Sequence, residues 1–395
     1  MINRTTLSLT ALTLSLFNTG ATQAVTFNDD VELLKQKHQP IILTNGNSRL
    51  AVLAEYQGRA MVSSMAGDSG QSIGWMDRQL LQQDLSNVQN LNVGGVSRLW
   101  YGPEKGPYAL FFKPGKEQVV ETIHYPDAMT HIAFDVVKQS SQQVEFNKTI
   151  QLTNHMGTDF TFDVNRRIEL FDREQLVESL GVPIPLALDA VGFSAKTQLT
   201  NASTKTLSRD KGLVAIWELG CFYPNATVAI PMEPPLAEIT SYFTPLKHSH
   251  TRVKGNTVFY KADASYLNKI GIRPAQTKPI MGSYNAELNM LTVVKFQFKP
   301  PADGTYVNSE WVDDVDPYAG DVTNIFNHGI QQDGKAGPFY EMETSSHASE
   351  LSPGQSTEHY HNTYHFSGNK KQLSRVSEAL LGVTLQQLQQ AFDSP

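Results

Sequence analysis

Disulfide bonds within the chain are excluded, because Cys221 is the only cysteine among the 395 residues. A domain without disulfides has to be stabilised by its hydrophobic core. The chain is long and 40% of its residues are hydrophobic, so it can form a large core. We therefore expect a fold that depends on side-chain packing rather than on covalent cross-links.

Long hydrophobic runs are lacking as well. The most apolar run, residues 7–17, contains threonine and serine and is shorter than the roughly 20 residues that a membrane-spanning helix needs. Arg4 precedes this run and small residues at 20–24 follow it, which is typical of a cleaved secretory signal. We predict a signal peptide at residues 1–24, no membrane anchor, and a periplasmic or secreted protein.

Clusters of basic residues are also missing. The 32 lysines and arginines are scattered, and the 39 aspartates and glutamates give a formal net charge of −7. Proteins that bind nucleic acid present a basic face or stripe, so we exclude nucleic acid as a partner. No G-x-S-x-G, P-loop or H-E-x-x-H motif occurs, and no G-x-G-x-x-G follows a strand, so serine hydrolase, nucleotide and zinc-peptidase chemistry have no support.

Strand patterns dominate what is present. Several segments alternate polar and apolar residues or are rich in Val, Ile, Thr and aromatic residues. These segments are 40–44, 49–54, 59–65, 109–112, 131–137, 143–154, 160–170, 213–219, 257–261 and 291–298. Helical patterns cover 77–85, 172–180, 371–381 and 385–392. With no internal repeat and no Pro- or Ser-rich linker, we predict a single all-β domain at 25–395, an antiparallel sandwich with a few peripheral helices.

The longest segment without strand character runs from Tyr306 to Pro338 and is rich in Asp, Asn and aromatic residues. Long irregular segments in compact domains are usually binding loops or disordered, and the aromatic content argues against disorder. Carboxylates such as Asp313, Asp314 and Asp316 match the oxygen ligands of calcium, although no EF-hand spacing is present. A solvated acidic loop is the alternative to a binding loop.

Glu341 and Glu343 share one face of an expected strand, because side chains alternate along a strand with a period of two. Two carboxylates this close repel each other, which raises the pKa of one of them into the range of a general acid or base. The alternative is a pair of solvated glutamates on an exposed face.

Histidines occur in two groups. His359, His361 and His365 share a strand face, and H-x-H is a spacing that metal sites use, but a row of hydrogen-bonded histidines fits equally well. His248 and His250 lie in an expected loop and are candidate acids. No metal site and no cofactor are assigned, and calcium remains only as the alternative described above.

The four tryptophans, Trp75, Trp100, Trp217 and Trp311, lie close to Gly, Pro or Asp near the ends of expected strands or in loops. Indole rings in such places stack on sugar rings or belong to the core. The sequence leaves both roles open.

Three segments resemble, in order, landmarks of the galactose mutarotase-like (aldose 1-epimerase) superfamily. They are the opening hairpin at 50–65, the double glycine with its Trp-Tyr-Gly-Pro run at 94–104, and the segment 340–366, which contains Glu343 before a threonine and the Pro353-Gly354 turn. The resemblance implies an antiparallel β-supersandwich with a ligand cleft on its concave face. Segments 94–104 and 306–338 would edge that cleft.

Within this superfamily the chain is most similar to a family of uncharacterised secreted bacterial proteins. The similar segments are 94–104, 306–311, 317–321 and 338–354. That family has no established activity, so this closer similarity adds no reaction to the prediction.

The superfamily resemblance implies a carbohydrate partner and site residues. Glu343 matches the catalytic glutamate, with Glu341, His248 and His250 as further catalytic candidates. The residues expected to hydrogen-bond or stack on the sugar are Arg98, Trp100, Glu104, Trp311, Asp321 and Asn327. The leading hypothesis is a carbohydrate-binding protein with aldose epimerase or mutarotase activity.

Two departures from the superfamily pattern matter. No histidine follows the double glycine until His124, so the acid that protonates the ring oxygen is unidentified. Asn92 and Val93 stand where the sugar-phosphate branch has a phosphate-binding arginine, which argues against a phosphorylated sugar. A non-catalytic glycan-binding protein is therefore one alternative. A glycan-cleaving lyase or hydrolase that uses Arg98 with Tyr101 or His124 is another. The sequence gives no indication of the oligomeric state.

Overall fold

The fold consists mainly of two large β-sheets, of which the first has ten strands. The computed structural model describes residues 24–85, 92–235, 239–298, 300 and 305–393. Within them, ten strands form this sheet in the order β12 (Thr251–Lys254), β13 (Thr257–Ala262), β10 (Ala226–Pro231), β15 (Ile280–Asn285), β16 (Met290–Phe296), β19 (Ser356–Ser367), β8 (Asp189–Asn201), β7 (Asp159–Leu170), β6 (Gln143–Thr153) and β5 (Asp135–Gln139).

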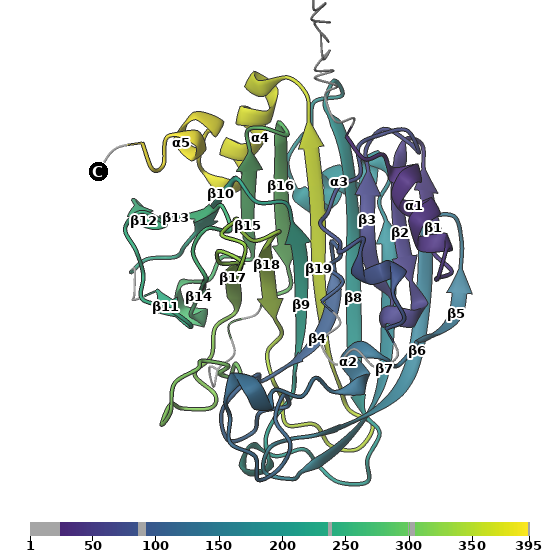
Figure 1. Ribbon diagram of the computed structural model, residues 1–395, viewed down its shortest axis with the longest axis vertical. Coiled ribbons are helices and arrows are strands. Elements are labelled where there is room, and N and C mark those ends of the chain that lie inside the picture. Colours follow the sequence, from purple (N-terminus) through teal and green to yellow (C-terminus); the bar gives the residue numbers. More distant parts are fainter. Residues whose placement is uncertain (1–23, 86–91, 236–238, 299, 301–304, 394–395) are drawn as a thin grey trace, which may run out of the picture.

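A second sheet packs against the first. Its six strands follow the order β11 (Thr240–Ser241), β14 (Asn268–Ile272), β17 (Thr323–Asn327), β18 (Tyr340–Ser345), β9 (Ala215–Phe222) and β4 (Arg98–Gly102). A third sheet contains β1 (Ile41–Asn45), β2 (Ser48–Leu53) and β3 (Arg59–Ser64). Neighbouring strands in all three sheets are antiparallel, which confirms the predicted all-β class (Figure 1).

Helices are few and peripheral, as predicted. They are α1 (Phe27–Lys35), α2 (Asp127–Thr130), α3 (Arg173–Leu180), α4 (Lys370–Leu381) and α5 (Leu385–Gln389). Figure 1 shows α4 and α5 at one end of the ten-stranded sheet. Apolar residues of α3, α4 and α5 form a cluster with residues of β16 and β19. The core between the sheets is a separate cluster that includes Phe146, Phe162 and Met342.

The sequence predictions deviate from the structure in identifiable places. The predicted helix at 77–85 is wrong: only a 3₁₀ turn, Leu80–Gln82, forms, although the Asp77 carboxylate accepts hydrogen bonds from the backbone N–H groups of Gln79 and Leu80 as a helix cap would. Segment 109–112 is fully buried but is not a strand. The region predicted to be irregular, 306–338, contains β17.

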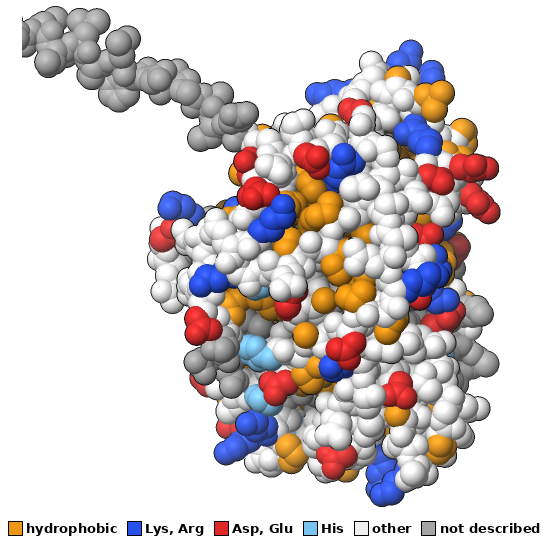
Figure 2. Space-filling view, turned by 90° about the vertical axis from the view of Figure 1, so that its right-hand side faces the viewer, with side chains coloured by type: hydrophobic (Ala, Val, Ile, Leu, Met, Phe, Trp, Pro, Cys, Tyr) orange, Lys and Arg blue, Asp and Glu red, His pale blue; other side chains and the backbone are white. Residues whose placement is uncertain are grey.

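Two further predictions concern the chain termini and membranes. Except for its last residue, the predicted signal peptide at 1–24 lies outside the described residues. Within the described residues, no helix is long and apolar enough to cross a membrane. On the face that Figure 2 shows, acidic and basic side chains are interspersed.

A polar network crosses the core between the two large sheets. On β7, alternate residues from Phe160 to Leu170 point inward, and Arg166 is one of them. Its guanidinium binds both carboxylate oxygens of Glu218 on β9, at 2.8 and 2.7 Å, and donates to Thr197 on β8. Because both charged side chains are almost completely buried, this ion pair links the two sheets without help from solvent.

The three histidines of β19 belong to the same interior. Nε2 of His359 and Nδ1 of His361 lie 2.8 and 2.9 Å from the Thr344 hydroxyl, and Nδ1 of His365 lies 2.9 Å from the Thr292 hydroxyl. In the described part of the chain, no group of three or more His, Cys, Asp or Glu side chains could hold a metal ion. The row therefore has the hydrogen-bonded arrangement rather than a metal-binding one.

These histidines should make the protein sensitive to acid. Burial lowers the pKa of His359, His361 and His365 to about 3, whereas an unfolded histidine has a pKa of about 6.5. The folded state then binds fewer protons than the unfolded state between these two values. Stability present above pH about 6.5 is lost as the pH falls toward about 3, by about 2 kcal/mol per histidine at pH 5.

Urea unfolding at a series of pH values checks this expectation. The His365→Gln variant should lose free energy of unfolding less steeply with falling pH than the parent, because one titrating group is gone. Parallel pH profiles for parent and variant would contradict it.

Candidate active site

The site arises from the register of the six-stranded sheet. Directly opposed residues of antiparallel strands point to the same face. Glu341 on β18 pairs with Phe326 on β17, and Phe326 pairs with Lys269 on β14. Glu343 pairs with Leu219 on β9, which in turn pairs with Arg98 on β4. Strands β18, β14 and β4 thus place charged side chains on the face directed away from the core.

This face forms the floor of a cavity of about 320 Å³. The lining combines charged side chains with a wall of aromatic rings. The lining residues are Asn92, Arg98, Trp100, Glu104, Val120, Ile123, Tyr125, Trp217, Leu219, Phe243, Leu267, Lys269, Trp311, Phe326, His328, Phe339, Glu341 and Glu343. Apolar walls with a few convergent polar groups are typical of small-molecule sites.

Glu343 lies at the bottom of this cavity and is 1% exposed. Its Oε2 accepts hydrogen bonds from the Trp217 indole at 3.0 Å and from the Lys269 ammonium at 2.8 Å. Within the described residues Oε1 receives no hydrogen bond. Burial raises the pKa of Glu343 to about 7; the positive charge of Lys269 opposes this rise and the negative charge of Glu341 adds to it. One oxygen is thus fixed, while the other can accept a proton from a ligand.

Glu341 is held in a different way. Its Oε1 accepts from Arg98 at 2.6 Å and from the Cys221 thiol at 3.0 Å. The Arg98 guanidinium lies 4.0 Å from the centre of the Trp100 ring, a cation–π contact that further restricts it. Burial raises the pKa of the Cys221 thiol, so this cysteine stays protonated and donates. Glu341 therefore acts as a structural anion that holds Arg98 in the floor.

Glu104 follows β4 at the edge of the cavity. Its backbone N–H donates to the Ser309 hydroxyl at 2.9 Å, which ties the segment after β4 to the 306–321 loop. No Lys or Arg of the described chain lies within ion-pair distance of its carboxylate. Burial raises the pKa of Glu104, and the charge of Lys269 opposes that rise.

His328 is a cavity residue that sequence reasoning did not select. Its Nδ1 donates to the carbonyl of Gly329 at 2.9 Å, so Nε2 is the nitrogen that is left to exchange protons. The ring packs edge-on against Phe339 and Phe326. Gly337 makes room for it, because a Cβ at this position would lie 2.2 Å from Nδ1. His328 was in the segment read as irregular. It directly follows β17, and only its spacing of two residues from Phe326 could have indicated that both side chains point to the same face.

Three of the four tryptophans, Trp100, Trp217 and Trp311, line the cavity, and the two that were expected to stack on sugar are among them. Trp100 and Trp217 pack edge to face, with ring centres 5.5 Å apart. Trp75 instead packs against Phe339, 4.5 Å between centres, and is not a lining residue.

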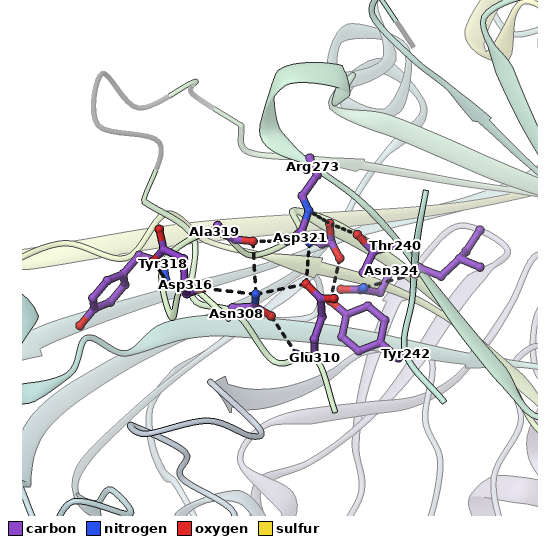
Figure 3. A network of polar contacts seen from close by, with 11 residues as sticks. Thr240, Tyr242, Arg273, Asn308, Glu310, Asp316, Tyr318, Ala319, Asp321 and Asn324 are labelled. Carbon is purple, nitrogen blue, oxygen red and sulfur yellow. Dashed lines mark hydrogen bonds and ion pairs between the residues drawn. The ribbon is translucent and has the colours of Figure 1, made fainter. Parts of the chain in front are cut away.

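Asp321, which was expected to bind sugar, lies in a buried polar network outside the cavity. It is 3% exposed and accepts hydrogen bonds from Tyr242 at 2.7 Å and Thr240 at 3.1 Å, with Arg273 at 3.4 Å (Figure 3). Arg273 also bonds Glu310 and the carbonyl of Ala319. The network fastens the loop that carries Trp311 to the sheet, so Asp321 positions the cavity wall and does not line the cavity.

The local packing around Asp321 is tight. A Cβ at residue 271 would lie 2.0 Å from Oδ2 of Asp321, so glycine is required where β14 passes the carboxylate. Burial raises the pKa of Asp321 to about 6, and Arg273 opposes that rise. The carboxylates at 313, 314 and 316 are exposed and form no cluster with calcium ligands in the described chain.

The remaining candidates lie elsewhere. Asn327 is completely buried and bonds the backbone N–H of Ala264 and the carbonyl of Tyr266, so it supports a turn. His248 and His250 belong to the turn before β12, where His250 lies 3.4 Å from Asp263. None of these three residues lines the cavity. The structure thus brings together Glu343, Glu341, Arg98, Trp100, Glu104 and Trp311.

A larger hollow of about 920 Å³ lies between the β12–β13 hairpin and the C-terminal helices. Its charged lining residues are Lys254, Lys278 and Asp393, and it contains no buried carboxylate. We place the site in the smaller cavity, because buried ionisable groups and aromatic rings converge there and not in the larger hollow.

The fold is a galactose mutarotase-like β-sandwich. Among solved structures it is similar to a putative aldose 1-epimerase from Escherichia coli K12, with a TM-score of 0.50 and 12% identity over 83% of this chain and 98% of that one. The Slr1438 protein from Synechocystis sp. PCC 6803 gives a TM-score of 0.50 and 12% identity, covering 84% of this chain and 96% of that one. At this identity the likeness shows the fold alone.

The chain belongs to a family of unknown function, DUF6786, whose match extends over residues 25–392. No curated protein matches the sequence. The superfamily resemblance seen in the sequence is therefore confirmed at the level of the fold, and the function has to be argued from the site.

Proposed function

We propose that this protein binds a non-phosphorylated sugar in the cavity and interconverts its anomers. The observation that carries the proposal is Glu343, a buried carboxylate with one free oxygen and a pKa of about 7 at the bottom of an aromatic cavity. A general base works best when its pKa lies near the working pH. Aromatic faces such as those of Trp100 and Trp311 suit the apolar faces of a sugar ring.

The reaction needs a base at the anomeric hydroxyl and an acid at the ring oxygen. Glu343 removes the proton of the C1 hydroxyl, the bond between C1 and the ring oxygen breaks, and protonated His328 gives its Nε2 proton to that oxygen. The open-chain aldehyde rotates about its C1–C2 bond, and the reverse proton transfers close the other anomer. Tyr125 is a poorer acid, since burial raises its pKa to about 12.

The charged residues also explain the choice of a sugar without phosphate. Both cations of the floor are already paired, Arg98 with Glu341 and Lys269 with Glu343. A phosphate would have to compete with these carboxylates for its counter-charge, at the cost of leaving a buried glutamate unpaired. We further propose that the protein acts after export, on the basis of the sequence at 1–24.

A non-catalytic glycan-binding protein is the second candidate. The ion pair between Lys269 and Glu343 favours it, because a carboxylate stabilised by an ammonium is a weaker base. The glycan-cleaving alternative has less support. Tyr101 is fully buried on the opposite face of the sheet, and His124 is not a lining residue of the cavity, so neither joins Arg98.

Proton NMR of freshly dissolved and anomerically equilibrated neutral hexoses, with and without the mature protein, tests the proposal. Faster exchange between anomers is the expected result. Line broadening with unchanged exchange would establish the binding protein instead, and no effect on any sugar would exclude both.

The His328→Gln variant should separate the acid from the rest of the site. We expect the catalysed exchange rate to fall by about 100-fold, because a positioned general acid contributes roughly that much, while sugar affinity changes little. Phe326→Leu is a matched control that alters the wall beside His328 and removes no proton donor. An unchanged rate in His328→Gln would assign the acid to another residue.

A further inference from the structure

One carboxylate of the cavity makes no ion pair with a lysine or arginine of the described chain. The cavity is lined by the carboxylates of Glu104, Glu341 and Glu343 and by the cations Arg98 and Lys269. Two of the glutamates lie within 2.6 and 2.8 Å of a cation, but Glu104 has no cation within ion-pair distance in the described chain. A partly buried carboxylate without a counter-charge costs free energy unless a ligand supplies that charge.

A second observation concerns a hydrogen-bond donor of the same cavity. The indole N–H of Trp100 is buried and has no hydrogen-bond acceptor in the described chain, although Trp100 lines the cavity and is only 9% exposed. Buried donors are normally satisfied, so this N–H is available to a hydrogen-bond acceptor that the described chain does not supply. The rings of Tyr125 and Trp311 line the same cavity and offer negative π-faces to a cation.

From this unpaired carboxylate we infer that the site prefers a sugar with a protonated amine, such as a 2-amino-2-deoxyhexose, over neutral sugars and over uronic acids, and that Glu104 binds the ammonium group. The inference rests on the proposed function and adds the substrate class. A uronate would bring a further carboxylate into a site whose lysine and arginine are already paired. An ammonium group would give Glu104 an ion-pair partner.

Isothermal titration calorimetry at a pH below the pKa of the sugar amine tests the inference. The ligands compared are D-glucosamine, N-acetylglucosamine, D-glucose and D-glucuronate. N-acetylglucosamine is the matched ligand, since it keeps the nitrogen and loses the charge. We expect glucosamine to bind about tenfold more tightly than either neutral sugar, which is typical of a charge-assisted hydrogen bond, and glucuronate not to bind.

Glu104→Gln should remove this preference, because glutamine keeps the shape and loses the charge. Asp314→Asn is the matched control: it removes one negative charge from an exposed position of the neighbouring loop. If glucose and glucosamine bind equally to the parent, or if the preference survives Glu104→Gln, the inference is wrong while the proposed function stands. If no sugar of any charge binds, the proposed function itself fails.

Discussion

Replacing Glu343 with glutamine is expected to lower the protein-catalysed rate of anomer exchange by about 100- to 10,000-fold, the range over which general acid–base groups contribute. The amide cannot remove the proton of the C1 hydroxyl. It can still accept hydrogen bonds from the Trp217 indole and from Lys269, which now hold the carboxylate at 3.0 and 2.8 Å. Binding of the sugar should therefore survive within a few-fold, so that the loss falls on turnover.

Glu341→Gln is the informative comparison, because residue 341 lies two positions earlier on the same strand face. Its carboxylate is engaged by Arg98 and Cys221. We expect this variant to weaken binding or stability more than it slows turnover per bound sugar. If Glu343→Gln retains the parent rate, Glu343 is not the base and the mutarotase proposal does not hold.

The largest effect on stability is expected from Arg166→Leu. This change leaves Glu218 charged and buried between the sheets without its partner, and breaking a buried ion pair in this way costs about 3–5 kcal/mol. The neighbouring residue offers a control, because Arg167 is 43% exposed in its side chain and pairs with Glu169. Arg167→Leu should cost less than about 1 kcal/mol.

Urea unfolding of the two variants at neutral pH measures both losses of unfolding free energy. An equal loss for Arg166→Leu and Arg167→Leu would mean that the interior ion pair contributes no more to stability than the surface ion pair. Restoring part of the lost stability with Glu218→Leu in the Arg166→Leu background would confirm that the cost comes from the unpaired carboxylate.

The period-two pattern predicted the part of the site that belongs to one strand. Glu341 and Glu343 were expected on one face because of their spacing, and both line the cavity. The same rule placed the histidines of β19 together. Helix α3 could be predicted because Asp172 caps its first turn and Gly181 ends it in a left-handed conformation.

Contacts between strands that are distant in sequence could not be predicted. Lys269 lies on β14, a strand of five residues without alternation, and only pairing with β17 brings it beside Glu343. His328 was read as part of an irregular loop. Asp321 looked like a loop residue available to a ligand, and its burial under Tyr242 and Thr240 depends on β11, a two-residue strand with no signal of its own.

The pH profile of anomer exchange catalysed by the parent protein tests the central claim most directly. The account predicts a catalysed rate that is proportional to protein concentration and has a bell-shaped dependence on pH. The rate rises with an apparent pKa of about 7, because burial raises the pKa of Glu343 to that value and only its ionised form accepts the proton; it falls again at higher pH, because the group that protonates the ring oxygen must carry its proton. A rate equal to that of buffer at every pH, with a sugar shown to be bound, would contradict catalysis and leave a carbohydrate-binding protein.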